Sequence, residues 1–312
     1  GNLASGAISK AISALDSFAK SAVAAGANFQ AAMSQVQAIS GATGDDLDAL
    51  NKKAVEMGSK TKFSATESAE AFNYMAMAGW KTQDMLDGIE GIMNLAAASG
   101  EDLATTSDIV TDALTALGYA AKDSGHLADV MAAASSNANT NVGMMGETFK
   151  YAASVAGAMG YSMEDVALAT GLMANSGIKA TQAGTSLRSM ISRMAAPTSA
   201  VAKAMDELGV KINDSNGKAR PFRDVIGDLR ESMKGMSETE KTAAANTIAG
   251  KNAMSGFLAI INSSDKDFKK LVNAIDSCDG AAQEMADTMI DNLGGQVTIL
   301  KSQLQELAIG AG

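Results

Sequence analysis

The chain contains one histidine, His126, and one cysteine, Cys278, whose side chains are common nucleophiles and proton carriers in enzymes. The two could in principle form a thiol dyad, but no sequence around either residue supports that arrangement. Zinc sites built from several histidines or several cysteines are excluded, and so is an internal disulfide, because each needs more such side chains than the chain has. We therefore interpret His126 as a surface residue at the start of a helix.

Two acidic pairs, Asp45-Asp46 and Glu164-Asp165, could in principle supply the carboxylates of a glycosidase. Both pairs stand where helices are expected to begin, and negative charge at that position complements the helix dipole. We therefore interpret them as structural. The sequence contains no phosphate-binding loop, nucleophile elbow or dinucleotide-binding motif. It predicts no catalytic, cofactor-binding or metal-binding residue, and we expect the protein not to be an enzyme.

The composition of the 312 residues favours an all-α protein. Hydrophobic residues make up 46% but aromatic ones only 4%, so the core is expected to rely on alanine and on the 20 methionines. These residues favour helices, and only Pro197 and Pro221 are present to interrupt them. A net charge of −10 without a run of basic residues argues against direct nucleic-acid binding. The longest uncharged stretch, 21–44, contains asparagine and glutamine and is not expected to span a membrane.

A long amphipathic helix is expected over residues 1–40. Apolar or small residues recur at a spacing of seven, and a second series follows four residues later, which places one stripe along about four heptads. Two interpretations of this stripe stay open: the helix packs on its own domain, or it forms a self-associating coiled coil, which Gly26 would weaken. The two series are Ile8, Leu15, Ala22, Phe29, Val36 and Ile12, Ala19, Gly26, Met33.

Residues 41–207 are expected to form a core of short helices paired into hairpins. Helices are predicted to end at Gly79-Trp80, Gly118-Tyr119 and Gly160-Tyr161, because glycine accepts the left-handed conformation and the aromatic side chain packs back on the last turn. These pairs recur about every 40 residues, which is typical of helical repeats. Helix starts are predicted where a hydroxyl precedes an acidic residue by three positions: Thr43…Asp46, Ser64…Glu67, Ser99…Asp102, Ser162…Asp165 and Ser237…Glu240.

One segment breaks the helical pattern. Residues 208–222 are predicted to form a small β-hairpin near 210–222, because two short extended pieces flank the turn DSNG, which ends at Gly217. Helices are expected to resume at Phe222 and to continue over 223–312, with interruptions near Gly235 and at Gly294-Gly295. The first residues, GNLASG, show no initiator methionine or signal-peptide pattern, so we expect a piece of a longer protein.

Six separated stretches together resemble phage tail tape measure proteins in their order and spacing over about residues 29–300. Each stretch alone consists mostly of helix caps, turns and small residues, so the joint match carries the resemblance. The stretches are FQAAMSQVQAISGAT at 29–43, FSATESAEA at 63–71, AMAGW at 76–80, LAAASGEDL at 95–103, SGIKATQAGTSLR at 176–188, and DELGV at 206–210 leading to D-x-x-G-K-x-R-P at 214–221.

The resemblance implies a structural phage or prophage protein that controls tail length and tail assembly and is ejected with the genome at infection. It implies the tail tube protein, the tail assembly chaperones and the tail-tip or distal tail proteins as partners, and a homo-oligomer in the tail lumen. It places the protein in the virion tail, and in the host cytoplasm during assembly, and leaves contact with the host membrane after ejection open. The long uninterrupted helical ruler of the family is not seen in this chain.

Two other functions remain as alternatives: a helical-repeat adaptor that binds partner proteins, and a cell-wall hydrolase module attached to a tail. If compact, a chain of this length has a diameter of about 50 Å. We therefore hypothesise that it lies at a tail end or must open before it passes a narrow lumen.

Overall fold

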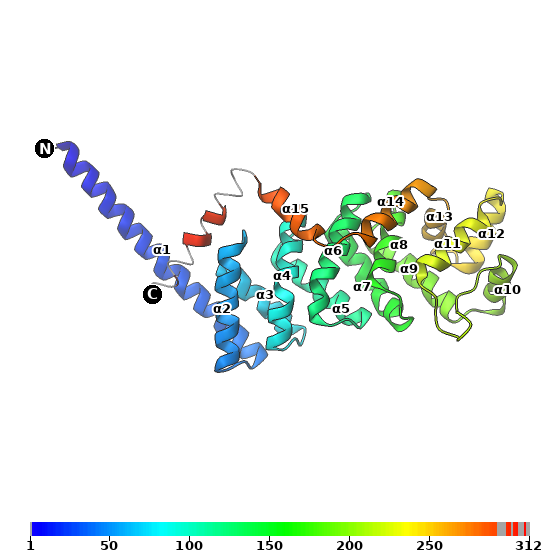
Figure 1. Cartoon of the computed structure of the whole chain (residues 1–312), viewed down its shortest axis with the longest axis horizontal. Coiled ribbons are helices and arrows are strands. Elements are labelled where there is room, and N and C mark those ends of the chain that lie inside the picture. The colour runs from blue at the N-terminus through cyan, green and yellow to red at the C-terminus, as the bar shows by residue number, and fades with distance from the viewer. Residues whose placement is uncertain (1, 292–297, 301, 305–308, 310–312) are drawn as a thin grey trace.

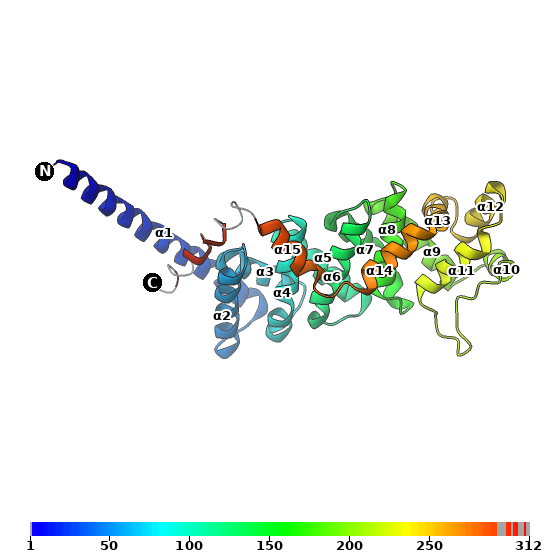
Figure 2. The ribbon, with the colours of Figure 1, turned by 45° about the horizontal axis from the view of Figure 1, so that its top comes forward.

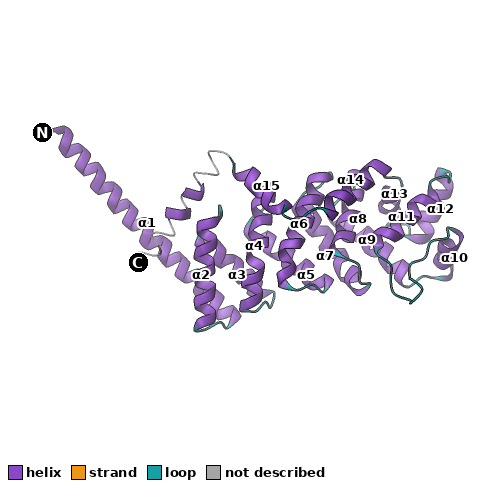
Figure 3. Ribbon diagram, in the orientation of Figure 1, coloured by secondary structure: helices purple, strands orange, loops and turns teal. Residues whose placement is uncertain are grey.

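The computed structural model describes residues 2–291, 298–300, 302–304 and 309; for 2–19 and 22 it describes the backbone alone. Within those ranges helices alternate with loops and no strand is present (Figure 3), which confirms the expected all-α class. The helices are α1 (Asn2–Ser40), α2 (Asp45–Lys60), α3 (Ala65–Met77), α4 (Thr82–Ser99), α5 (Leu103–Leu117), the 3-10 helix η1 (Ala121–Asp123), α6 (Ser124–Asn137), α7 (Val142–Ala158), α8 (Met163–Asn175), α9 (Ala180–Ala195), α10 (Ser199–Glu207), α11 (Phe222–Met233), α12 (Glu238–Ile248), α13 (Met254–Ile261), α14 (Asp265–Asp276) and α15 (Ala281–Ile290).

Consecutive helices pair into hairpins that stack in two layers (Figure 1). Helices α1, α3, α5, α7 and α9 pack against one another in one layer, and α2, α4, α6 and α8 form the other. Figures 1 and 2 show an array drawn out along one axis, so the predicted repeat geometry is confirmed. The compact shape assumed for the tail-lumen hypothesis is wrong, because each hairpin buries its apolar face mainly against its two neighbours.

Glycine–aromatic pairs end three helices of the first layer, as the sequence predicts. Gly79, Gly118 and Gly160 have φ values of 86°, 81° and 73°. Gly118 directly follows α5, and Gly79 and Gly160 lie two residues after the last residue of α3 and of α7. The aromatic residue that follows donates its backbone N–H into the last turn, as Trp80 does to the carbonyl oxygen of Met75 at 3.1 Å. Because this closure recurs once per hairpin, it explains the period seen in the sequence.

An aspartate five residues after each of these glycines completes the repeating motif. Asp84 and Asp123 each accept the backbone N–H of the residue three positions earlier, at 3.1 and 3.0 Å. In the third unit Asp165 is 2% exposed and bonds instead to the distant Phe222. The sequence analysis identified the glycine and the aromatic residue but missed this aspartate as part of the repeat.

Three of the five predicted helix starts are confirmed. Ser64 with Glu67 and Ser237 with Glu240 form complete capping boxes at α3 and α12, in which serine and glutamate exchange hydrogen bonds. Ser162 caps α8 through its side chain. In each case the capping hydrogen bond joins residues three positions apart.

The other two predicted starts are wrong. Thr43 does not cap α2, which begins after Gly44 at a φ of 56° and without a side-chain cap. Ser99 ends α4, where its hydroxyl donates to the carbonyl oxygen of Leu95 at 2.7 Å. Asp102 caps α5 in its place, because its carboxylate can accept an N–H of the first turn and suits the positive end of the helix dipole.

Small residues let the helices of one layer approach closely. A Cβ atom on Gly157 of α7 would lie 2.5 Å from the carbonyl oxygen of Ala116 on α5. A Cβ atom on Gly184 of α9 would lie 2.8 Å from the carbonyl oxygen of Thr148 on α7. Neither distance is compatible with a larger side chain unless the helices separate.

The predicted β-hairpin does not form as two strands. Residues 208–221 make a loop with a single antiparallel bridge between Asn213 and Ala219, and Phe222 begins α11. The turn is as predicted, with Gly217 at a φ of 79°. Its N–H groups are satisfied locally, because a carboxylate oxygen of Asp214 accepts from the backbone of both Asn216 and Lys218 at 2.9 Å. Two backbone hydrogen bonds join the flanking pieces, from Asp214 to Lys218 at 2.8 Å and from Arg220 to Ile212 at 2.9 Å.

Helices α10 to α13 close the far end of the stack, and two arginines terminate helices there. Arg193 on α9 donates to the carbonyl oxygens of Thr247 and Ile248 at the end of α12, at 2.9 and 3.1 Å. Arg230 on α11 donates to the carbonyl oxygen of Ile260 at the end of α13, at 2.8 Å. A cation at this position compensates the negative end of the helix dipole.

The last two helices return along the second layer (orange in Figures 1 and 2). Helix α14 packs on α8 and α6, and α15 packs on α6 and α4. One hydrophobic cluster therefore runs from Phe29 on α1 to Ala286 on α15. The division at residues 40, 207 and 222 stays a prediction, and the predicted break at Gly294-Gly295 lies outside the described residues.

Helix α1 runs unbroken over 39 residues and projects from the stack (Figure 1). Phe29, Met33 and Val36 of the predicted stripe are buried where α1 packs on α3, in agreement with a helix that packs on its own domain. Earlier members of the stripe have side chains outside the described residues, so amphipathicity along the whole helix and coiled-coil formation stay predictions. Among the described residues, no helix combines the length and apolarity that a membrane crossing requires.

Candidate functional site

The structure brings His126 and Cys278 together, although they are far apart in the sequence. His126 lies in the first turn of α6, as predicted, and its Nε2 is 2.6 Å from Oε1 of Glu164 on α8. Cys278 is buried in the turn between α14 and α15. Burial, together with the charges of Asp129 and Asp279, raises the pKa of Cys278 to about 11. The thiol is therefore protonated at neutral pH and is not an activated nucleophile.

The acidic pairs behave as the structural interpretation predicts. Asp45 and Asp46 lie in the first turn of α2. Glu164 bonds to His126, whereas the neighbouring Asp165 accepts the backbone N–H of Phe222 at 2.8 Å. Glu164 and Asp165 are thus engaged in contacts between helices, whereas Asp45 and Asp46 are exposed at the start of α2.

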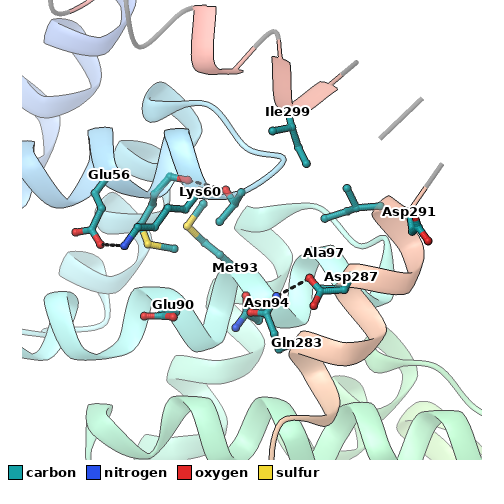
Figure 4. A pocket seen from close by; sticks show the side chains of 14 residues that line it. Glu56, Lys60, Glu90, Met93, Asn94, Ala97, Gln283, Asp287, Asp291 and Ile299 are labelled. Atoms are coloured by element: carbon teal, nitrogen blue, oxygen red, sulfur yellow. Dashed lines mark hydrogen bonds and ion pairs between the residues drawn. The ribbon is translucent and has the colours of Figure 1, made fainter. Parts of the chain in front are cut away.

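A groove lies between α2, α4 and α15, and Figure 4 shows the side chains that line it. Its volume is about 420 Å³. Its base includes the buried Met57, Met93 and Ala97, and its rim is polar. The rim residues are Glu56, Lys60, Thr61, Glu90, Asn94, Gln283, Asp287 and Asp291.

The charged groups of this groove are paired or solvated. Lys60 Nζ lies 2.6 Å from Glu56 Oε1, and this hydrogen bond lowers the pKa of Glu56. Gln283 donates to Asp287 at 2.7 Å (Figure 4). The described lining residues include neither histidine nor cysteine. The groove thus combines an apolar base with a mainly acidic rim.

Residues 51–250 match the family described as phage-related minor tail protein. The chain belongs to that family. It is 41% identical to the tape measure protein of Pneumococcus phage Dp-1 over 94% of its length, and it covers 25% of that protein. It is 28% identical to the probable tape measure protein of Escherichia phage P2 over 89% of its length, covering 35% of that protein. No solved structure matches the chain.

The chain thus spans between a quarter and about a third of these tape measure proteins. The family match begins within α2 and ends just after α12, so it covers most of the stack and part of its closed end. Helix α15, which lines the groove, and the turn that carries Cys278 lie outside the family match. The resemblance to tape measure proteins is confirmed, and the comparisons support neither the adaptor nor the hydrolase alternative.

The sequence analysis missed the groove because its lining comes from both ends of the chain. Its only local signal is on α15, where the buried Ala282 and Ala286 lie one turn apart and each is followed by a polar residue, Gln283 and Asp287. That spacing identifies an amphipathic helix. It does not identify the partner helices.

Proposed function

We propose that this chain is a folded, non-catalytic module of a tape measure protein that takes part in tail assembly and adds little to tail length. Its similarity to tape measure proteins over nearly its whole length supports the assignment. Its two-layer stack supports the second part of the proposal.

The geometry of a helical stack makes it a poor ruler. A continuous helix advances about 1.5 Å per residue. Each hairpin of the stack uses about 40 residues to advance by one helix-packing distance, about 10 Å. Per residue, the stack therefore extends roughly sixfold less than a single helix. Helix α1, with 39 residues in one rod, is the part of this chain with ruler-like geometry.

We infer that the tail tube protein, the assembly chaperones and the tail-tip proteins are the partners of this module. The groove between α2, α4 and α15 and the projecting helix α1 are the surfaces suited to them. The heptad pattern of α1 before Phe29 supports self-association in the tail lumen. In this proposal the protein is made in the host cytoplasm, becomes part of the virion tail and leaves with the genome.

An internal deletion tests the proposed role in the phage or prophage that carries the gene. Removing residues 65–141 takes out two hairpins and joins Ser64, an N-cap residue, to the start of α7. If the segment is folded in the tail, tail length measured by electron microscopy should change by about 20 Å. If it is one extended helix, tails should shorten by about 115 Å.

The matched control is a deletion of equal length in a continuous helical region elsewhere in the gene, which should shorten tails by about 115 Å. Circular dichroism of the isolated chain shows whether the deletion variant still folds. Proportional shortening by the 65–141 deletion would contradict the folded-module proposal. Normal infectious tails in a phage that lacks the gene would contradict any role in the tail.

The alanine- and methionine-rich core affects how easily such a module could unfold to pass a narrow tail lumen. Alanine buries little area, and methionine packs without fixing one arrangement, so opening the stack should require modest free energy per residue. Because the stack is drawn out rather than compact, its diameter does not by itself require opening. We propose from the composition of the core that the module opens before ejection, or that it lies at a tail end. Urea denaturation should show low cooperativity and fast unfolding, and a very stable, slowly unfolding chain would contradict this proposal.

A further inference from the structure

The turn between α14 and α15 is held in one geometry against α6. Asp129 on α6 accepts the backbone N–H groups of Gly280 and Ala282, both at 2.9 Å, through its two carboxylate oxygens. Gly280 has a φ of 80°, which glycine adopts without strain. Hydrogen bonds from α6 therefore fix the backbone of this turn, and the Cys278 side chain is buried close to His126 of α6.

Three side chains with metal-binding atoms converge at this turn. A ring nitrogen of His126, Sγ of Cys278 and a carboxylate oxygen of Asp279 all lie within 4.8 Å of one another. In a tetrahedral zinc site, bonds of about 2.0 to 2.3 Å place the ligand atoms roughly 3.5 Å apart. His126 is partly exposed and Asp279 is exposed, so both can close the remaining distance by side-chain rotation.

The contact between His126 and Glu164 orients the imidazole for metal binding. Glu164 Oε1 lies 2.6 Å from Nε2 of His126. An ionised carboxylate there favours the tautomer that carries its proton on Nε2, which leaves the lone pair of Nδ1 available. A carboxylate that accepts from the second nitrogen of a histidine is the usual outer support of a metal-bound imidazole.

The local charge also favours a cation. The carboxylates of Asp129, Asp279 and Glu164 all act electrostatically on the Cys278 side chain. A thiolate, an imidazole and a carboxylate form a mixed ligand set that suits Zn²⁺ better than Mg²⁺ or Ca²⁺, which prefer oxygen ligands. The sequence analysis excluded sites with several histidines or cysteines, but it did not consider this mixed set.

We propose that His126, Cys278 and Asp279 bind one Zn²⁺ ion, with Glu164 orienting the imidazole and water completing the coordination. On binding, the Cys278 thiol loses its proton to solvent and the sulfur forms a bond to the metal; no redox change is involved. The ion joins α6 to the turn that follows α14. It therefore fastens the returning helices α14 and α15 to the second layer of the stack.

Titration of the purified, reduced chain with Co²⁺ tests the site, because a thiolate ligand produces a charge-transfer band in the near ultraviolet. One Co²⁺ per chain should bind, and Zn²⁺ should displace it. Cys278→Ser and His126→Ala should each abolish the band. Glu164→Gln should keep the band and weaken binding about 10- to 100-fold. At a hundredfold excess over its dissociation constant, Zn²⁺ should raise the Tm by about 4 °C.

Glu70→Gln is the matched control, because Glu70 is an exposed carboxylate on α3, far along the chain from the proposed ligands. It should leave the band and the affinity unchanged. Circular dichroism checks that Cys278→Ser folds, and the more exposed His126 provides a variant less prone to misfolding. A band that persists in His126→Ala, or no band at saturating Co²⁺, would overturn the proposal. Both results are independent of any role in the tail.

Discussion

Replacing Asp165 with asparagine should weaken the contact between the start of α11, at the closed end of the stack, and α8. The Asp165 carboxylate accepts the backbone N–H of Phe222 at 2.8 Å, and the backbone N–H and Nε of Arg223 at 3.2 and 3.1 Å. These bonds fix the start of α11 against α8. Asparagine keeps the shape of the side chain but removes its charge and one acceptor oxygen, so at least one of these buried donors loses its partner.

The expected loss follows from burial. The Asp165 side chain is 3% exposed, and removing one partner of a buried ion pair costs about 3 to 5 kcal/mol. The value should fall at the lower end, about 3 kcal/mol, because Arg223 keeps its second partner, Asp276, and the asparagine oxygen still accepts one N–H. The equivalent Asp84 is half-buried and accepts one N–H in a solvent-exposed hydrogen bond, so Asp84→Asn should cost about 1 kcal/mol or less.

Urea unfolding followed by circular dichroism measures both variants under the same conditions. Hydrogen exchange then locates the effect, because a repeat array need not unfold in one step. Asp165→Asn should accelerate exchange in α11, whereas Asp84→Asn should affect only α4. A second substitution, Arg223→Met, should couple to Asp165→Asn in a double-mutant cycle by about 2 kcal/mol. Equal losses for the two aspartate variants would refute the reasoning.

Three further predictions test packing and charge. The Tyr161 hydroxyl is buried without a partner among the described residues, and burial raises the pKa of Tyr161 to about 12. Tyr161→Phe should therefore keep or raise the thermal stability, by up to about 1 kcal/mol. Gly157→Ala should lower the free energy of unfolding by about 1 to 3 kcal/mol, because α7 must move away from α5. Gly26→Ala has open space around it and should increase the helix content. If circular dichroism shows the same change in stability for both variants, the close contact between α5 and α7 is contradicted. Burial alone would raise the pKa of Glu164, but hydrogen bonds from His126 and Ser162 hold it below the usual 4.5. The ionised Glu164 therefore stabilises the fold above pH 4.5, and this contribution is lost as the pH falls through its lowered pKa. In acid unfolding, His126→Ala should lose less stability between neutral and low pH than the unsubstituted chain.

Features that depend on a few neighbouring residues could be predicted from the sequence. Gly118 ends its helix because a left-handed residue is needed there, and the need is met within one turn. The box of Ser64 and Glu67 is likewise complete within four residues. The all-α class, the long first helix and the hairpin period all follow from such local signals.

Errors arose where two local solutions compete. Ser99 and Asp102 both precede α5, and a hydroxyl followed by an acid three residues later suggested that Ser99 was the cap. The charged side chain is the better acceptor for the first turn, so Asp102 caps the helix. Around Asp214 the carboxylate takes the N–H groups of Asn216 and Lys218, so the turn closes locally and the flanking pieces form a single bridge rather than strands.

Contacts between distant segments could not be predicted. Nothing in the sequence near Asp129 indicates that it will bind the turn at Gly280, and nothing near Asp165 indicates Phe222. These pairings depend on the return of the chain along the second layer. That return is decided by the total burial of α14 and α15, which is spread over many weak apolar contacts.

The two ends of the stack differ in a way that gives the module a direction. At the far end α10 to α13 cover the last hairpins, and along the second layer α14 and α15 cover α4, α6 and α8. At the near end Val23, Ile39 and Met77 remain 74%, 45% and 60% exposed, and Ile39 and Met77 border the same hollow with Leu103. Repeat arrays normally cover a free end with polar residues, and exposed apolar side chains mark an interaction surface. The groove beside α2 opens near this end too, so the proposed tail partners should meet the stack at α1 to α3 rather than at α10 to α13.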